Sequence, residues 1–308
     1  MYLTELERVR ILSSMNVLDS GARAQVVAML VEGMSIRATS RVTGVAKGTI
    51  LKLLADLGAA CRAYHDAHVR ELRCQRVQCD EIWAFVGAKD KNLLEDERGV
   101  YGVGSVWTWT ALDADSKLMV SYHVGTRDAG CAYEFMQDVA SRIVTRIQLT
   151  TDGHKPYLLA VADAFGPSNI DFAQLVKFYG EVPAGAGRYS PPACLGVEMV
   201  PRMGAPDMDH VSTSYVERQN LTMRMGMRRF TRLTNAFSKK CENLEHAVAL
   251  HFTHYNFCRV HQTLRVTPAM AAGISDHVWD LAELVALIPK PVAKPWGSVK
   301  RTATSTSA

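Results

Sequence analysis

The chain has 308 residues, of which 48% are hydrophobic, and a net charge of only +4. This length and composition allow a sizeable core and about two domains, and the weak overall charge alone does not indicate a polyanion partner. The charged N-terminus lacks the apolar core of a signal peptide, and no apolar run is long enough to span a membrane. The seven cysteines form no CxxC pairs, which favours reduced thiols, so we expect a cytoplasmic protein.

Three helical blocks are predicted near the N-terminus from apolar residues at helical spacing: 22–32, 35–42 and 45–57. A short turn at Gly44 precedes the third block, a layout typical of a helix-turn-helix DNA-binding domain, here residues 1–58. The residues expected to face DNA are Lys47, Thr49 and Lys52. A three-helix bundle with no nucleic-acid role is the alternative. Residues 59–75 are predicted as a connecting helix.

From residue 76 the pattern changes to strands alternating with helices. Strands are predicted at 77–86, 99–112, 117–124, 146–151 and 172–179, and helices at 126–146, 156–165, 215–232 and 242–261. Residues 180–211 are rich in Pro and Gly and are predicted as a long loop. This order resembles an α/β fold of the RNase H-like type, a mixed sheet flanked by helices, over residues 76–275. Residues 276–308 are expected to form a C-terminal helix and a basic, disordered tail.

Three of the predicted elements each carry an acidic residue that could belong to one shared site. Asp80 lies within the first predicted strand, Asp152 ends the fourth, and Glu217 lies on the late helix. The first and fourth strands are neighbours in an RNase H-like sheet, so these acids can share one site. Glu81 is expected to point to the opposite face from Asp80, because strand side chains alternate. Three carboxylates meet the demand of two Mg²⁺ or Mn²⁺ ions in phosphodiester cleavage.

A basic block surrounds the last of these acids. Between residues 218 and 240 there are seven Lys or Arg and no Asp or Glu, a local charge that can neutralise phosphates. The residues expected to contact DNA here are Arg218, Arg228, Arg229, Arg232, Lys239 and Lys240. On one continuous helix Glu217 and Arg224 would lie seven residues apart, close to one face. A solvated basic helix with one internal ion pair is the alternative.

Three motifs carry a resemblance to a known family. CDEIWAFVG around Asp80, TTDGHKPY around Asp152 and YVERQNLTMRMGMRRFTRLTNAFSKK around Glu217 closely resemble the DDE transposases of the insertion-sequence-one family. HYNFCRVHQTLRVTPAMAAGI resembles a tail shared by many transposases and integrases. The resemblance covers residues 76–275 and implies that Asp80, Asp152 and Glu217 are catalytic metal ligands, and that Arg224 is a catalytic basic residue. Members often carry an N-terminal zinc-binding segment with paired cysteines, which this chain lacks before Cys61.

The function expected from this resemblance is transposition of an insertion sequence. The protein would bind terminal inverted repeats, cleave DNA at the element ends and join the 3′ ends to target DNA. Its partners would be these two double-stranded DNAs, without a membrane, and it would act on the nucleoid as a homodimer or larger assembly. Two alternatives stay open: a DNA-binding regulator with an inactive catalytic domain, and a metal-dependent nuclease without strand transfer.

Overall fold

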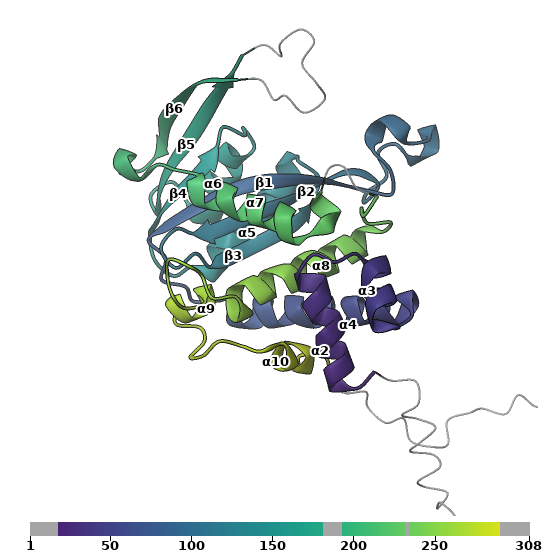
Figure 1. Cartoon of the computed structure of the whole chain (residues 1–308). Coiled ribbons are helices and arrows are strands. Elements are labelled where there is room, and N and C mark those ends of the chain that lie inside the picture. The colour runs from purple at the N-terminus through teal and green to yellow at the C-terminus, as the bar shows by residue number, and fades with distance from the viewer. Residues whose placement is uncertain (1–17, 181–192, 232–234, 290–308) are drawn as a thin grey trace, which may run out of the picture.

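The computed structural model describes residues 18–180, 193–231 and 235–289, and Figure 1 shows a mixed sheet with helices packed against it. The sheet has six strands in the order β3-β2-β1-β4-β5-β6. The strands are β1 (Arg76–Val86), β2 (Gly104–Asp113), β3 (Met119–Gly125), β4 (Ile147–Asp152), β5 (Ile170–Tyr179) and β6 (Cys194–Met203). The first three are antiparallel neighbours, β4 and β5 run parallel to β1, and β6 is antiparallel to β5. This confirms the predicted RNase H-like mixed sheet.

The helices keep the labels of Figure 1. They are α2 (Ser20–Val31), α3 (Ile36–Thr43), α4 (Lys47–His68), α5 (Ala129–Arg142), α6 (Tyr157–Phe165), α7 (Ser214–Gly226), α8 (Cys241–Thr253), α9 (Pro268–Ala271) and α10 (Leu281–Ala286). A 3₁₀ turn, η4 (Arg228–Phe230), follows α7, and a π-helical turn, η5 (His254–Cys258), extends α8. The shorter 3₁₀ turns are η1 (Asp90–Asn92), η2 (Glu95–Glu97) and η3 (Met208–His210). No helix in the described ranges has the length and apolar character needed to cross a membrane.

Strand β1 separates two hydrophobic cores because its side chains alternate between the faces of the sheet. Val77 and Cys79 belong to the core beneath α5 and α6. Ile82 and Val86 belong to the other core, which also contains apolar residues of α2, α4, α7 and α8. The N-terminal helices therefore share one core with the sheet and do not pack as a separate bundle.

Helix α4 packs directly on α8, and a glycine makes this possible. A Cβ on Gly58 would lie 2.4 Å from the Cβ of His246, closer than atoms can approach. The predicted third helix and the predicted connecting helix are in fact this single helix, which ends at His68. The helix runs through residue 58, because the buried stripe continues without a break through Leu57 and Cys61. The division into domains stays a prediction.

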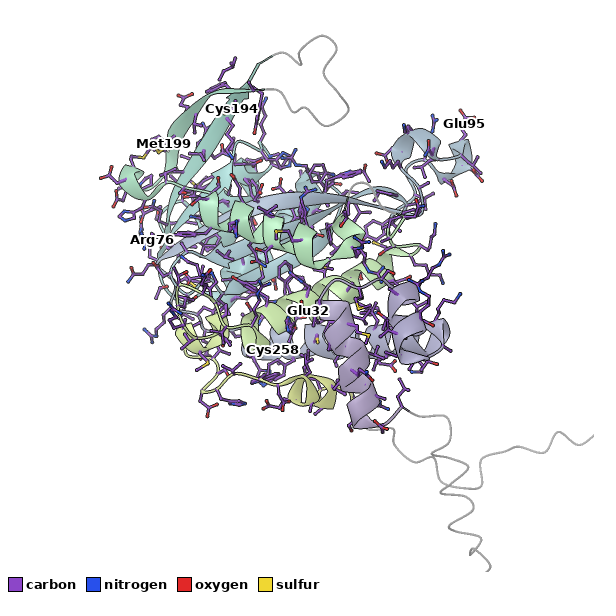
Figure 2. All side chains as sticks on the ribbon, viewed as in Figure 1. Glu32, Arg76, Glu95, Cys194, Met199 and Cys258 are labelled. Atoms are coloured by element: carbon purple, nitrogen blue, oxygen red, sulfur yellow. The ribbon has the colours of Figure 1, made fainter. Side chains whose placement is uncertain are left out.

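Two further expectations need correction. Part of the loop predicted at 180–211 is the edge strand β6. Its Gly196 and Pro201 are not typical of a strand, so the sequence pattern did not predict one, but an edge strand tolerates proline. It projects with β5 beyond the body of the molecule, and Figure 2 shows Cys194 and Met199 on this hairpin. The predicted helix at 215–232 ends at Gly226, because Met227 adopts an extended backbone.

Candidate metal centre

Asp80 and Asp152 come together where the parallel pairing of β1 and β4 ends. The last paired residues are Cys79 and Thr151, so each aspartate is the next residue on its strand. Oxygen atoms of Asp80, Glu81 and Asp152 all lie within 4.8 Å of one another. The structure therefore places two of the expected acids side by side and adds Glu81 to them.

Asp80 faces α7, and side chains of β1 and β2 fix this arrangement. The buried Gln78 accepts hydrogen bonds from the backbone N–H groups of Tyr215 and Val216, at 2.9 and 3.1 Å, and so caps the start of α7. One turn later Asn220 donates to Asp80 Oδ2 at 2.9 Å. The Thr110 hydroxyl in turn donates to the side-chain oxygen Oδ1 of Asn220 at 3.3 Å. This contact orients the side-chain amide of Asn220 toward the Asp80 carboxylate.

Burial raises the pKa of Asp80 to about 6, and the negative charges of Asp152 and Glu217 add to this effect. Burial also raises the pKa of Glu81 to about 7, again with a contribution from Asp152. Carboxyl groups that lie close together in a buried site favour the protonated form, unless a bound cation neutralises their charge.

Glu81 projects into the α5–α6 side of the sheet, as strand alternation predicts, yet it belongs to the site. Its side chain is only 1% exposed, and its Oε2 accepts a hydrogen bond from Arg127 at 3.0 Å. The buried Tyr157 hydroxyl faces this carboxyl group and lowers its pKa, against the larger effect of burial. The alternation argument missed this residue because Asp152 ends its strand, where carboxylates from both faces can reach it.

Arg127 links two of the three clustered acids. It contacts Glu81 and also donates to Asp152 Oδ2 at 3.2 Å, while its guanidinium lies 4.8 Å from the centre of the Trp107 ring. The backbone N–H of His154 holds the other oxygen of Asp152 at 2.9 Å. No sequence signal singled out Arg127, since it lies in the connection after β3 and its partners come from two other strands.

Glu217 lies on the same side of α7 as Asn220, but outside the group of three carboxylates. Its Oε1 accepts a hydrogen bond from Thr213 at 2.6 Å and forms an ion pair with Lys177 of β5. Its negative charge adds to the burial and to the charge of Asp152, which together raise the pKa of Asp80. Arg224 follows two turns after Glu217 and is partly buried.

The residues expected to contact DNA divide between separate places. Lys47, Thr49 and Lys52 are exposed near the start of α4, and Lys52 pairs with Asp56. Arg218 is exposed on α7. Arg228 and Arg229 lie in η4, not on α7 as predicted, and Lys239 and Lys240 precede α8. Arg232 lies outside the described residues.

The carboxylate cluster fits a divalent cation. Its donors are hard oxygen atoms, which Mg²⁺ and Mn²⁺ prefer. Asp80 and Glu81, whose pKa values burial raises, converge with Asp152 and give a site with excess buried negative charge. A cation bound among these oxygens would neutralise that charge.

Comparison with known proteins gives little beyond this geometry. No protein-family profile matches the sequence, and neither does any curated protein. The crystal structure of the Mos1 strand transfer complex is similar at 13% identity over 55% of this chain and 64% of that chain, with a TM-score of 0.22. The Mos1 transposase paired-end complex with left transposon end is similar at 12% identity over 55% and 65%, with a TM-score of 0.23. This chain covers less than two thirds of either matched chain, and at these TM-scores the likeness adds no support to the fold or the site.

Proposed function

We propose that the protein is a DDE-type DNA transposase of the insertion-sequence-one kind, which cleaves the ends of its element and joins them to target DNA. The observation that carries this proposal is the convergence of Asp80 and Asp152 under the face of α7 that bears Glu217. The three motifs with the family resemblance surround these same residues.

Asp80, Asp152 and Glu217 would hold two Mg²⁺ or Mn²⁺ ions, which when bound supply an activated attacking oxygen and stabilise the leaving oxygen. Asn220 orients Asp80 by a direct hydrogen bond, and Arg127 restrains Asp152. Glu217 joins the other two acids once its ion pair with Lys177 opens. Arg224 is assigned to a phosphate of the DNA, because a guanidinium binds phosphate oxygens in a bidentate manner.

Helices α2 and α3 and the first half of α4, within the proposed domain of residues 1–58, are assigned to recognition of the terminal inverted repeats. Lys47, Thr49 and Lys52 support this role, since all are exposed near the N-terminal end of α4, the part of a recognition helix that reads bases. Because α4 buries its apolar side against α8, this role is tested in the full chain. Lys47→Ala combined with Thr49→Ala should reduce the preference for repeat DNA over random DNA, whereas Arg41→Ala should not.

The experiment for the chemistry uses a labelled duplex from the DNA that flanks the coding sequence, a supercoiled plasmid and Mg²⁺. Wild type should cleave the duplex and join a pre-cleaved end to the plasmid, as a homodimer or larger assembly that brings two ends together. Asp152→Ala should abolish both reactions and still bind DNA, while Asp163→Ala, an exposed acid on α6, should behave as wild type.

Other outcomes favour other functions. Cleavage at the wild-type rate in Asp152→Ala would remove the assigned site. Free nicking without any joining by wild type would identify a nuclease, and specific binding with neither reaction would identify a regulator.

A further inference from the structure

A second concave site lies at the far end of β1 from the carboxylates. It is a cavity of about 840 Å³ between the starts of α3 and α4, the η4 turn, residues 235–239 and α8. Val86, the last residue of β1, forms a β-bridge with Ser238 beside this cavity. Asp80 lies six residues earlier on the strand, so the two sites are separated by about 20 Å at roughly 3.3 Å per residue.

Positive charge surrounds this cavity, which we call the η4 cavity. Its lining includes Arg37, Lys47, Arg228, Arg229 and Lys239. None of the described residues that line it is Asp or Glu. Since like charges repel, a cavity with this lining is suited to an anionic ligand.

Arg229 is the strongest single indication of such a ligand. Burial lowers the pKa of its guanidinium to about 10, and the group donates a hydrogen bond to the Ser238 hydroxyl. Within the described chain no carboxylate forms an ion pair with it. A guanidinium has five N–H donors, and buried charges are normally paired. The remaining donors of Arg229 can therefore bind an anionic ligand.

Backbone groups add to the positive potential. Helix α4, 22 residues long, begins at Lys47 on the cavity wall, and its N-cap residue, Ala46, provides no side-chain hydrogen bond. The first backbone N–H groups of a helix carry partial positive charge and attract anions. This helix end therefore reinforces the charge of the five basic side chains.

The other part of the wall is apolar. Leu54, Met227 and Leu250 line it together with the aromatic ring of Phe237. Lys239 places its ammonium 3.9 Å from the centre of that ring, and Phe85 packs against the ring with 4.6 Å between ring centres, so Phe237 belongs to the apolar wall without a free face for stacking. A cationic rim beside an apolar wall fits a phosphate joined to a nucleobase, because the wall can bury the flat apolar faces of the base.

We propose that the η4 cavity binds an unpaired nucleotide of the DNA strand that the protein acts on, with its phosphate on Arg37, Lys47 and Arg229 and its base on the apolar wall. This inference rests on the proposed function, which supplies the DNA. A paired nucleotide does not satisfy both parts of the cavity, because its base is stacked inside the duplex. The ligand is therefore a nucleotide at an unpaired end or one turned out of the duplex.

The test measures binding without catalysis. Full-length protein with Asp152→Asn is titrated in EDTA with a fluorescent hairpin DNA that carries a three-nucleotide unpaired end, and with the same hairpin made blunt. We expect about tenfold tighter binding of the unpaired end, the effect of burying about 55 Å² of a base against the apolar wall. Arg37→Ala and Phe237→Ala should each remove most of this preference. Arg41→Ala is the matched control, since Arg41 is exposed on the same helix as Arg37 and does not line the cavity.

Further arms separate the sources of the ligand. A hairpin whose unpaired end is abasic should lose the dependence on Phe237 and keep the dependence on Arg37. Millimolar dTMP should compete weakly; competition by dTMP as strong as by the oligonucleotide would instead identify a free-nucleotide site and overturn the proposal. Equal binding of blunt and unpaired ends by wild type, or an unchanged preference in Arg37→Ala with intact folding by circular dichroism, would overturn it too. Preference without cleavage by the protein that retains Asp152 would contradict only the proposed function.

Discussion

Asp80→Asn is expected to stabilise the metal-free protein, although it alters the proposed catalytic site. Burial raises the pKa of Asp80 from 3.8 to about 6, with the charge of Asp152 adding to it. The folded chain therefore binds this proton more tightly than the unfolded chain does. The contribution of this proton to the free energy of unfolding is complete below pH 4 and is lost as the pH rises through about 6. Since a tenfold change in proton affinity is about 1.4 kcal/mol, the ionised carboxylate costs the fold roughly 3 kcal/mol at pH 7.5.

Thermal unfolding in EDTA measures this effect. For 308 residues each kcal/mol moves Tm by about 1.5 °C, so the variant should melt about 5 °C above wild type at pH 7.5 and together with it below pH 4. Mg²⁺ at a hundred times its Kd should stabilise wild type by about 2.7 kcal/mol and the variant far less. Glu95→Gln is the control, because Glu95 is exposed on the insertion between β1 and β2 that Figure 2 labels.

Two results would refute this account of the site. A lower Tm for Asp80→Asn than for wild type in EDTA at pH 7.5 would show that the carboxylate stabilises the fold, and that its hydrogen bond from Asn220 outweighs desolvation. Equal stabilisation of both proteins by Mg²⁺ would show that the cation binds elsewhere.

Three other changes test the packing and the charges around the site. Arg127→Ala leaves a buried carboxylate without its cation and should destabilise the protein by about 1–3 kcal/mol at pH 8 but by much less at pH 5, in urea titrations. Lys177→Met removes a positive charge beside the site and should tighten Mg²⁺ binding about two- to fivefold by calorimetry; weaker binding would show that Lys177 orders the ligands. Gly58→Ala forces α4 away from His246 and should cost about 1–3 kcal/mol, whereas Gly48→Ala, with open space around it in the same helix, should stabilise by about 0.5–1 kcal/mol.

The sequence was sufficient to predict the neighbours Asp80 and Asp152, because element order alone brings the first and fourth strands together in this sheet. It was not sufficient for Glu81, Arg127 and Lys177. Their roles depend on contacts between side chains of different strands. The alternation of side chains predicts the face of the sheet on which a residue lies, but it does not predict which side chains meet at the end of a strand. Arg127 and Lys177 also lie outside every motif that the residues suggested.

The basic block shows a different limit of sequence reasoning. Seven basic residues among 23 predict a contact with a polyanion. The continuous helix predicted from the sequence would place most of these residues along α7. Gly226 ends that helix, and the chain then turns so that Arg228 and Arg229 face α3 and α4 at the η4 cavity. The extended backbone at Met227 therefore separates Arg218 and Arg224 on α7 from Arg228 and Arg229 at the η4 cavity.

Helix α7 connects these two sites physically. Its first half carries Glu217 and Asn220 over the carboxylates, and its last residue precedes the η4 cavity. There the backbone of Gly226 lies against Gly33, where an added Cβ would come within 2.9 Å of the Gly226 carbonyl oxygen. A ligand that fills the η4 cavity therefore contacts Met227, the residue after α7, and Gly33, which lies against the last residue of the helix. Gln78 holds the other end of α7 through the backbone N–H groups of Tyr215 and Val216, next to Glu217. A shift of the helix that changes the ion pair of Glu217 with Lys177 must therefore also release this cap.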